Sequence, residues 1–321
     1  MKLGIAGMGR MGANMARRLK NGGHDVCVFD IAPEKTETMV KEGFEGCGSP
    51  EELVKKLDSP RIIWVMLPAG NVTGNTISRL KGLLEKGDII IEGGNSYYKD
   101  DIKRAEELSK SGIEYVDAGV SGGIWGLKNG YAIMAGGKKE VFGRIEPLIK
   151  TLAPENGYMY CGSHGAGHFV KMIHNGIEYA IMEAYGEGFG ILKASEYGKD
   201  ISLEKVAGMW NAGSVVKSWL LELLEGAFKK DSNLENIQGY VGDSGEARWT
   251  VKQAVDTGVA ADVIAASLFK RFNSRQKDVF ADKVAAALRN EFGGHAVAKQ
   301  GEDARSDSQG AGEAKHAEGA E

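Results

Sequence analysis

Short apolar runs alternate with longer mixed stretches through the first half of the chain. The short runs are typical of buried strands, and the mixed stretches are typical of amphipathic helices. The predicted strands are Lys2–Ala6, Asp25–Phe29, Ile62–Leu67, Asp88–Glu92 and Tyr115–Val116. The predicted helices are Ala13–Lys20, Pro50–Leu57, Val72–Leu84 and Ala105–Lys110. Such alternation predicts an α/β domain with a parallel, doubly wound sheet of the Rossmann type, in which ligands bind beyond the carboxyl ends of the strands.

The pattern changes near Gly165, where proline almost disappears and Ala, Leu, Lys and Glu become common. Apolar positions there recur at helical spacing. The predicted helices are Phe169–Leu192, Ser202–Asn211, Val215–Leu224 and Val259–Leu288. We therefore expect an α/β domain over residues 1–164 and an all-helical domain over residues 165–298. Residues 299–321 are rich in Gly, Ala, Ser and charge without an apolar face, and we predict that they are disordered.

Length and charge narrow the class of protein. The chain has 321 residues, enough for two domains, and its formal net charge of −4 gives no reason to expect a nucleic acid or a membrane surface as partner. No run of about 18 apolar residues is present, so we expect no transmembrane helix, and the first residues lead into a strand rather than a cleavable segment. The cysteines Cys27, Cys47 and Cys161 are unclustered, which fits neither a zinc site nor a disulfide framework and favours a reducing cytoplasm.

A glycine-rich loop joins the first predicted strand to the first predicted helix. It reads Gly7-Met8-Gly9-Arg10-Met11-Gly12, the G-x-G-x-x-G pattern of dinucleotide-binding folds. Gly7 permits the tight turn, Gly9 lets a pyrophosphate approach the backbone, and Gly12 lets helix and strand pack closely. The helix N-terminus faces the phosphates with free N–H groups. Strand, loop and helix in this order predict a dinucleotide-binding domain over residues 1–164.

An acidic residue ends the second predicted strand. Asp30 lies about 20 residues beyond the glycine loop, where its carboxylate can accept hydrogen bonds from the adenine ribose hydroxyls. A 2′-phosphate would be repelled there, and no arginine follows Asp30 directly. We therefore expect NAD as the cofactor, with NADP less favoured.

Three further loops follow predicted strands, and we expect them around the nicotinamide and the substrate. Met66 and Leu67 lie on the nicotinamide side, and Asn95 offers a polar contact to cofactor or substrate. The run Ser121-Gly122-Gly123 offers a hydroxyl and backbone N–H groups suited to an anion. Each loop, taken alone, fits an ordinary turn equally well.

The most informative stretch of the chain is Gly165–Tyr179. On a helix, Lys171, Asn175 and Glu178 share one face, with His174 beside them. Burial of that face as ordinary core would leave charged groups unsatisfied. The alternative, a solvent-facing ion pair between Lys171 and Glu178, is disfavoured because residues seven apart are not neighbours on a helix surface. The stretch therefore predicts a catalytic site with a base candidate and an acid candidate.

The same stretch resembles the active-site helix of the decarboxylating 6-phosphogluconate dehydrogenase family. Two further segments are similar to the family. One is Asp243–Thr250, where Arg248 replaces the family's lysine, and the other is Arg289–His295, which resembles a sugar-phosphate-binding R-x-x-F-G-x-H segment. An extended helical region that longer members carry after the Arg271 segment is missing, so the chain resembles a short form that prefers NAD.

The resemblance implies a reaction and a set of roles. Hydride leaves C3 of 6-phospho-D-gluconate for NAD, CO2 is lost, and protonation of the enediol at C1 gives D-ribulose 5-phosphate of the pentose phosphate pathway. Lys171 would act as general base and then acid, Glu178 would protonate C1, and Asn175 and His174 would hold hydroxyls. The residues implied for the carboxylate and hydroxyl end are Asn95, Ser121, Gly122 and Gly123. The residues implied for the phosphate are Tyr179, Arg248, Arg271, Arg289 and His295. No metal is expected, because Lys171 takes its place as the electrophile.

Two alternatives remain open at this point. A 3-hydroxyisobutyrate-type NAD-dependent 3-hydroxyacid dehydrogenase shares the glycine loop, a Ser-Gly-Gly loop and a lysine followed four residues later by asparagine, but does not decarboxylate. The other is a non-catalytic NAD-binding protein. The long apolar helices and the family resemblance predict that residues 165–298 hold the substrate and form a homodimer or homotetramer. Whether Arg289 and His295 serve their own subunit or a neighbouring one also stays open.

Overall fold

The computed structural model describes residues 1–298 of the chain. Contacts divide the chain into two units, Met1–Arg271 and a second unit that begins at Phe272, and each is described by itself. The disordered tail predicted for residues 299–321 lies outside the described residues. None of the helices within residues 1–298 combines the length and the hydropathy that crossing a membrane requires.

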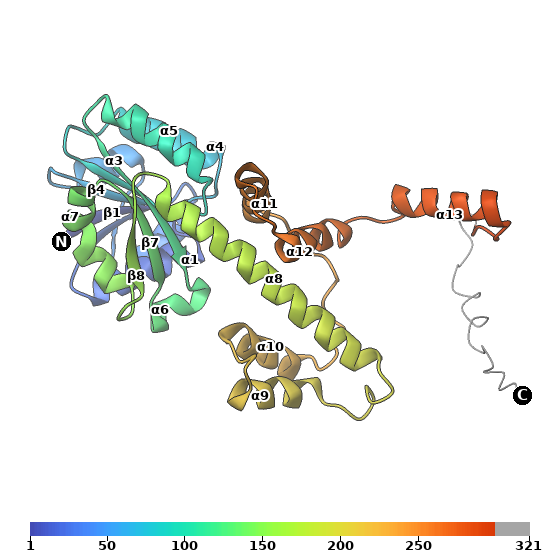
Figure 1. Ribbon diagram of the computed structural model, residues 1–321. Coiled ribbons are helices and arrows are strands. Elements are labelled where there is room, and N and C mark those ends of the chain that lie inside the picture. Colours follow the sequence, from blue (N-terminus) through green and yellow to red (C-terminus); the bar gives the residue numbers. More distant parts are fainter. Residues whose placement is uncertain (299–321) are drawn as a thin grey trace, which may run out of the picture. The chain divides into compact units, whose positions relative to one another are not determined.

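An eight-stranded sheet forms the centre of the first unit, with the strand order β3-β2-β1-β4-β5-β6-β7-β8 (Figure 1). The strands are β1 Lys2–Ala6, β2 Asp25–Phe29, β3 Glu45–Gly46, β4 Ile62–Val65, β5 Ile89–Glu92, β6 Glu114–Ser121, β7 Ala132–Gly137 and β8 Tyr158–Gly162. The order from β3 to β6 is that of the Rossmann fold, with its switch point between β1 and β4. The predicted doubly wound sheet is therefore confirmed.

One strand pair departs from the fully parallel sheet that the sequence predicts. β6 and β7 are antiparallel, with Ala118 opposite Ala135. A parallel pair needs a crossover of a dozen or more residues. The connection between these two strands holds only the short 3-10 helix Gly123–Trp125 and the short helix α6, Gly126–Asn129, so the chain turns back on itself.

Helices cover both faces of the sheet and create two apolar layers. They are α1 Arg10–Asn21, α2 Pro33–Lys41, α3 Pro50–Lys55, α4 Asn71–Lys81, α5 Tyr98–Ser109 and α7 Lys139–Leu152. Successive strand residues point to opposite faces, so Ile89 and Ile91 join the layer beneath α1 and α7, whereas Ile90 joins the layer beneath α3, α4 and α5. Fully buried strands of this kind leave the strand ends and loops as the place for ligands.

A long helix, α8, leads from the sheet into the helical part of the first unit (Figure 1). The helices of this part are α8 Ala166–Ala194, α9 Leu203–Gly213, α10 Trp219–Lys230, α11 Glu246–Thr257 and α12 Asp262–Asn273. Gly167 lets the first turn of α8 approach the backbone of β6 and β7, where a side chain would collide with Met134 O. Phe189 of α8 then packs with Leu221 and Phe228 of α10 in a separate apolar cluster. The helix thus links two cores.

The single helix predicted for Val259–Leu288 is wrong. The structure has α12, which ends at Asn273, and α13, Phe280–Gly293, with no helix between them. Polar residues fill the interval, and Asp278 has a left-handed φ of 56°, which interrupts a helix. Within residues 272–298 the second unit therefore contains the end of α12 and the helix α13, on which no side chain is buried.

Candidate active site

A cavity of about 1260 Å³ lies where β1, β4, β5 and β6 end and α8 begins. We call it the main cavity. The structure brings residues of every predicted loop to it: Gly9, Met11, Met66, Leu67, Asn95, Ser121, Gly122, Gly123, Lys171, His174, Asn175, Glu178 and Tyr179. Trp219 and Leu223 of α10 add an apolar wall. Its position at the switch point of the sheet is where open α/β folds bind their ligands.

The glycine loop has the shape that a dinucleotide needs. Gly7 has a φ of 105°, and a side chain there would collide with Met66 O, while one on Gly12 would collide with Gly7 O. A side chain on Gly9 would meet no atom within 4 Å, so the space beside its backbone is open. The loop is closed where strand and helix pack and open where a pyrophosphate would lie. These residues therefore fit a dinucleotide.

Asp30 is tied to the glycine loop. Its Oδ2 accepts a hydrogen bond from the Met8 N–H at 2.7 Å, and its Oδ1 accepts one from the Ala32 N–H at 2.9 Å. Lys35 Nζ lies 3.5 Å from Oδ1. Asp30 is therefore held in a buried position, with only 8% of the residue exposed. Its position is the one from which an acidic residue bonds the adenine ribose.

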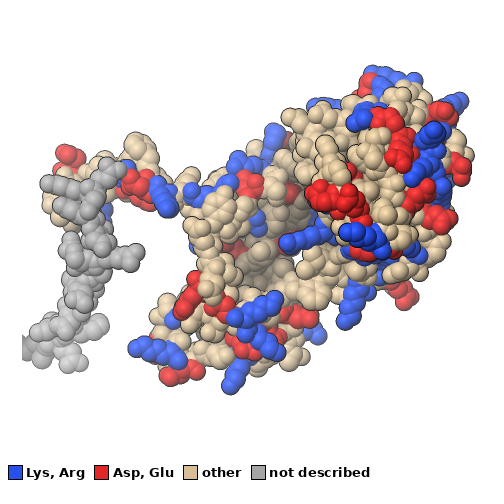
Figure 2. All heavy atoms as spheres, turned by 180° about the vertical axis from the view of Figure 1, so that it is seen from behind, with Lys and Arg blue, Asp and Glu red and all other residues tan. Residues whose placement is uncertain are grey.

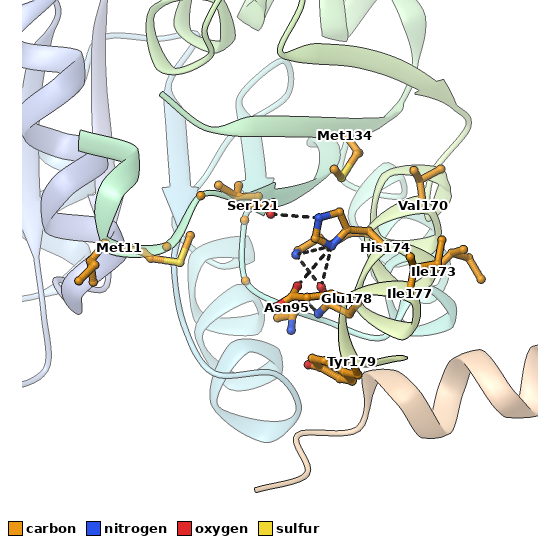
Figure 3. Close-up of a pocket in the computed structure, with 18 of the residues that line it drawn as sticks. Met11, Asn95, Ser121, Met134, Val170, Ile173, His174, Ile177, Glu178 and Tyr179 are labelled. Atoms are coloured by element: carbon orange, nitrogen blue, oxygen red, sulfur yellow. Dashed lines mark hydrogen bonds and ion pairs between the residues drawn. The ribbon is translucent and has the colours of Figure 1, made fainter. Parts of the chain in front are cut away.

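Four side chains of α8, of which Figure 3 labels His174 and Glu178, form a connected group that lines the main cavity. Lys171 Nζ donates to Asn175 Oδ1 at 2.6 Å and lies 3.3 Å from His174 Nδ1. His174 Nε2 lies 3.3 Å from Ser121 Oγ, and His174 Nδ1 lies 3.6 Å from Glu178 Oε2. The predicted helical face is thus assembled, and His174 connects its lysine to its glutamate.

A glycine on β6 allows the lysine to lie this deep. A side chain on Gly119 would collide with Lys171 Cβ, so the strand backbone packs directly against the lysine stem. Lys171 is 7% exposed, and burial lowers its pKa against the opposing charges of Glu178 and Glu246. Burial and the charge of Lys171 also lower the pKa of His174. The direction for Lys171 is the one that a general base near neutral pH requires.

A buried glutamate joins the site that the sequence analysis did not single out. Glu246, the first residue of α11, accepts hydrogen bonds from Asn95 Nδ2 and, at 3.3 Å, from the Tyr179 hydroxyl. Ser244 Oγ donates to it at 2.6 Å. A carboxylate is favoured at a helix N-terminus, and this was the only local signal available. Glu246 thus connects α11 to α8 and to the loop after β5.

The predicted phosphate ligands are only partly brought together. The Arg271 guanidinium lies 3.6 Å from the centre of the Tyr179 ring, and its Nη1 donates to Gly242 O at 3.0 Å. Burial raises the pKa of Tyr179 to about 12, so its hydroxyl remains a donor. Arg248 pairs with Asp243 and does not line the main cavity. Arg289 and His295 are exposed and belong to the second unit, and their role at the site stays a prediction.

Acidic and basic side chains are intermixed over the α/β part on the face drawn in Figure 2. Among the described residues one cluster has a metal-like composition, Glu92, Asp101 and His168, and it lies behind the loop that carries Asn95 rather than in the main cavity.

The cysteines are free, and burial raises the pKa of Cys27 to about 12 and that of Cys47 to about 11, which keeps both as thiols.

A Rossmann sheet with a dinucleotide loop, joined to a helix that carries a buried lysine at the switch point, defines a two-part nicotinamide-dependent dehydrogenase. Residues 2–162 match the NAD binding domain of 6-phosphogluconate dehydrogenase, and residues 167–311 match the 6-phosphogluconate dehydrogenase C-terminal domain. The chain belongs to the 6-phosphogluconate dehydrogenase family.

Named relatives agree with this membership. The chain is 47% identical, over 94% of its length and 100% of the other protein, to YqeC of Bacillus subtilis, provisionally named a 6-phosphogluconate dehydrogenase. It is 39% identical, over 94% of its length and 99% of the other protein, to the NAD(+)-dependent, decarboxylating enzyme of Haloferax volcanii. The solved 6-phosphogluconate dehydrogenase of Plasmodium falciparum matches with a TM-score of 0.78 and 29% identity, over 94% of this chain and 67% of that one.

Proposed function

We propose that this protein oxidises and decarboxylates 6-phospho-D-gluconate to D-ribulose 5-phosphate and CO2, with NAD as its preferred oxidant. One observation carries the proposal. Lys171, Asn175, His174 and Glu178 form a connected group in the same cavity as the dinucleotide loop. Each overall turnover converts one hydroxy acid and one NAD into one ketose phosphate, one CO2 and one NADH.

Lys171 begins the reaction as the base. Its burial favours the neutral amine, which accepts the proton of the C3 hydroxyl. Bound NAD supplies the acceptor for the hydride that leaves C3. Lys171 is then an ammonium and donates a hydrogen bond to the new C3 ketone oxygen, which draws in the electrons released as the C1–C2 bond breaks and CO2 departs. Asn175 Oδ1 holds the nitrogen in place through both steps.

Glu178 completes the reaction as the acid. After CO2 loss the enediol needs a proton at the former C2, which becomes C1 of ribulose 5-phosphate, and Glu178 lies two turns beyond Lys171 on the same wall of the main cavity. His174 lies between them, within 3.3 Å of Lys171 Nζ and 3.6 Å of Glu178 Oε2. Its lowered pKa keeps the imidazole neutral, so it can exchange hydrogen bonds with either neighbour and with a substrate hydroxyl.

The two ends of the cavity suit the two ends of the substrate. Ser121, Gly122 and Asn95 present a hydroxyl, a backbone N–H and an amide to the main cavity beside His174 and Asn175, where the carboxylate and its neighbouring hydroxyl would bind. Tyr179 lines the same cavity, and the guanidinium of Arg271, which is not among the lining residues, stacks on the Tyr179 ring and offers the planar fork that phosphate favours. We assign the phosphate to this pair.

The preference for NAD rests on Asp30. Its carboxylate would accept hydrogen bonds from ribose hydroxyls and repel a 2′-phosphate. Ile31 follows it, and Lys35 is the nearest cation. NADP is therefore expected to bind more weakly, with Lys35 as its partial compensation.

The proposed setting is a cytoplasmic homo-oligomer, a dimer or a tetramer. Met182 and Ile191 of α8 are exposed and do not line the main cavity, although apolar side chains of this size favour burial. Helices of the same kind from a second copy would cover them. A monodisperse monomer in light scattering would contradict this assignment.

Substrate choice is tested by following cofactor reduction with 6-phosphogluconate, gluconate and 3-hydroxyisobutyrate, each with NAD and with NADP. We expect reduction with 6-phosphogluconate, faster with NAD. Reduction with 3-hydroxyisobutyrate in its place would support the simple hydroxyacid dehydrogenase. Tight NAD binding without reduction by any of these acids would support a non-catalytic NAD-binding protein.

A further inference from the structure

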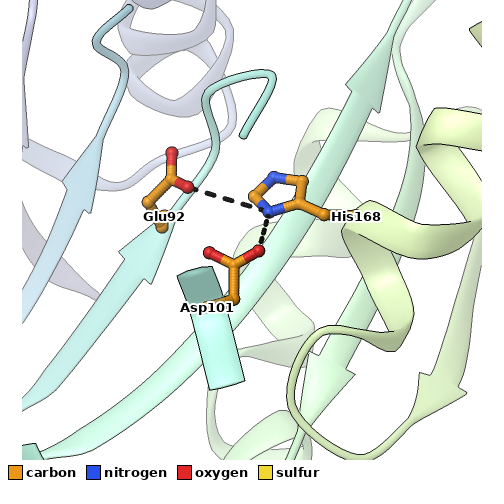
Figure 4. A group of neighbouring side chains, drawn as sticks. All are labelled: Glu92, Asp101 and His168. Carbon is orange, nitrogen blue, oxygen red and sulfur yellow. Dashed lines mark hydrogen bonds and ion pairs between the residues drawn. The ribbon is translucent and has the colours of Figure 1, made fainter. Parts of the chain in front are cut away.

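A buried ionic cluster lies directly behind the loop that presents Asn95 to the main cavity. Glu92 ends β5, Asp101 lies in the first turn of α5, and His168 lies in the first turn of α8 (Figure 4). Glu92 and Asp101 are fully buried and His168 is 1% exposed. His168 is the other histidine of the Gly165–Tyr179 stretch, beside His174, and the proposed reaction gives it no role.

The hydrogen bonds of His168 fix its protonation state. Its Nε2 lies 3.0 Å from Gly94 O, a carbonyl that can only accept, so this nitrogen carries a proton. Its Nδ1 lies 2.8 Å from Asp101 Oδ2. The other oxygen of Asp101 accepts from the Tyr115 hydroxyl at 2.7 Å and faces Arg104 Nη1 at 3.4 Å, which favours the ionised carboxylate. Both ring nitrogens are therefore donors, and the ring is an imidazolium.

The charges around the ring support this assignment. Burial lowers the pKa of His168, but the carboxylates of Asp101, Glu92 and Asp117 raise it more, to about 10. Glu92 Oε2 lies 3.7 Å from His168 Nδ1 and 3.6 Å from Arg104 Nη1. Asp117 of β6 accepts the backbone N–H groups of Gly165 and His168. The two cations His168 and Arg104 thus face Glu92 and Asp101, burial raises the pKa of Glu92, and Asp117 is satisfied by the start of α8.

A metal ion does not suit this cluster. The ligand atoms of Glu92, Asp101 and His168 lie within 4.8 Å of one another, as a metal site requires. However, His168 has no free lone pair while both nitrogens donate, and Arg104 fills the position beside the two carboxylates. The negative charges of Glu92 and Asp101 already face the cationic side chains of His168 and Arg104.

The cluster holds the peptide that precedes Asn95. The Gly94 N–H donates to Glu92 Oε1 at 2.7 Å, and the Gly94 carbonyl accepts from His168. A side chain on Gly94 would come within 2.6 Å of Glu92 Oε1 and of Leu67 O, so the loop fits closely. The next residue, Asn95, accepts a hydrogen bond at its Oδ1 from Asn175 Nδ2 of the active-site group, at 3.4 Å.

We propose that His168 is a positioning residue, which fastens the Gly94 peptide to α8 through its Nε2–H and so fixes Asn95 relative to Lys171, and that Asp101 holds its ring as an imidazolium. The role of Asn95 in turnover rests on the proposed function, whereas the protonation state and the contact to Gly94 do not. His168 acts through Asn95 and does not line the main cavity.

The first test reads the histidine itself in the full-length protein, so it remains valid whatever the substrate. Two-bond proton–nitrogen NMR spectra of 15N-histidine-labelled protein distinguish a doubly protonated ring from a neutral tautomer, and the His168→Leu spectrum assigns the signal. We expect His168 to stay doubly protonated from about pH 6 to about pH 9, where an ordinary histidine loses its proton. A neutral ring, or a titration near the ordinary value, would overturn the proposal.

The second test separates positioning from folding. Asp101→Asn lets His168 become neutral while Nε2–H still reaches Gly94, whereas His168→Leu removes the donor. We expect kcat/KM for 6-phosphogluconate to fall about 10²-fold in His168→Leu and less than about 5-fold in Asp101→Asn, because small misplacements carry large rate penalties. NAD affinity should change less than about 3-fold in both, because the glycine loop is untouched.

A second histidine near the cluster provides a matched control. His164→Gln changes a histidine four residues away that has no hydrogen bond to this loop among those of the described residues, and should leave kcat/KM within about 2-fold of the parent. Equal losses in His168→Leu and Asp101→Asn would overturn the proposal. So would stoichiometric binding of Zn²⁺ by the parent protein that His168→Leu abolishes.

Discussion

Lys171 Nζ lies 2.6 Å from Asn175 Oδ1, and both side chains are almost fully buried on the same face of α8. A buried ammonium is destabilised relative to water, and a neutral asparagine oxygen compensates only part of that cost. The amine is therefore held in a setting that favours its neutral form, as a base requires. The fold accepts a local loss of stability at this position for the sake of reactivity.

Replacement of Lys171 tests both its role as the base and its cost in stability. Lys171→Met should abolish turnover with 6-phosphogluconate while NAD still binds, measured by cofactor titration. The folded pKa of Lys171 is lower than its ordinary value of 10.5, so the unfolded chain binds more protons below that value. The stability of the parent relative to Lys171→Met should therefore rise as the pH approaches 10.5. A difference that is independent of pH, or substantial residual turnover, would contradict the assignment.

Removal of the acid should separate the two halves of the reaction. Glu178→Gln keeps Lys171 and the dinucleotide site, so hydride transfer should still give a rapid burst of NADH, followed by steady turnover slower by at least about 10²-fold. Stopped-flow absorbance distinguishes the phases. Glu187→Gln, an exposed change on the same helix, is the control and should behave as the parent does. If Glu178→Gln turned over at the parent rate, another group would be the acid.

Glu246, which accepts a hydrogen bond from Asn95, should influence the pKa of Lys171. Its negative charge raises the pKa of Lys171 against the larger effect of burial. Glu246→Gln removes that charge, so the acidic limb of the pH profile of kcat/KM should move to lower pH because the neutral amine survives there. Asp256→Asn, at an exposed position of the same helix, should leave the limb in place. A shift to higher pH would show that the coupling is not electrostatic.

The carboxylate at the end of β2 should set cofactor choice. Asp30→Ser removes the acceptor for ribose hydroxyls and the repulsion of a 2′-phosphate, so the ratio of kcat/KM for NAD to that for NADP should fall by about 10-fold or more. The exposed neighbour Glu34 provides the control, as Glu34→Gln should leave the ratio unchanged. An unaltered ratio in Asp30→Ser would place the discrimination elsewhere.

The guanidinium over Tyr179 should recognise phosphate. Arg271→Leu should raise KM for 6-phosphogluconate by about 10-fold or more and should leave kcat/KM for gluconate, which has no phosphate, unchanged. Arg271→Lys should recover only part of the affinity, because lysine lacks the planar fork. Lys270, one residue away, pairs with Glu183, and the variant Lys270→Met serves as the control. Equal losses for both substrates would point to a packing defect.

Local patterns in the sequence predicted much of the fold. The bounds of β1 and β2 agree with the prediction to the residue, because each is a short apolar run beside a clear turn signal. β6 is eight residues long where only Tyr115–Val116 were predicted, since Asp117, Ala118 and Gly119 have low strand propensity. Only the sheet shows why they are there: Gly119 accommodates Lys171, and Asp117 satisfies the start of α8.

Part of the candidate site could likewise be predicted from the sequence, and part could not. The face of α8 could be predicted because helical spacing alone brings Lys171, Asn175 and Glu178 together. Glu246 could not, because its contact with Asn95 joins residues 151 positions apart. The break between α12 and α13 was also invisible, since alanine-rich stretches on either side gave one continuous helical pattern.

The release of CO2 distinguishes oxidative decarboxylation from simple oxidation of the hydroxyl. The protein is incubated with 6-phosphogluconate labelled at C1 and with NAD, and released label is counted against NADH formed. The account predicts one CO2 for each NADH in the parent protein, and neither product with Lys171→Met. NADH without released label would contradict it and would make the protein a simple 3-hydroxyacid dehydrogenase.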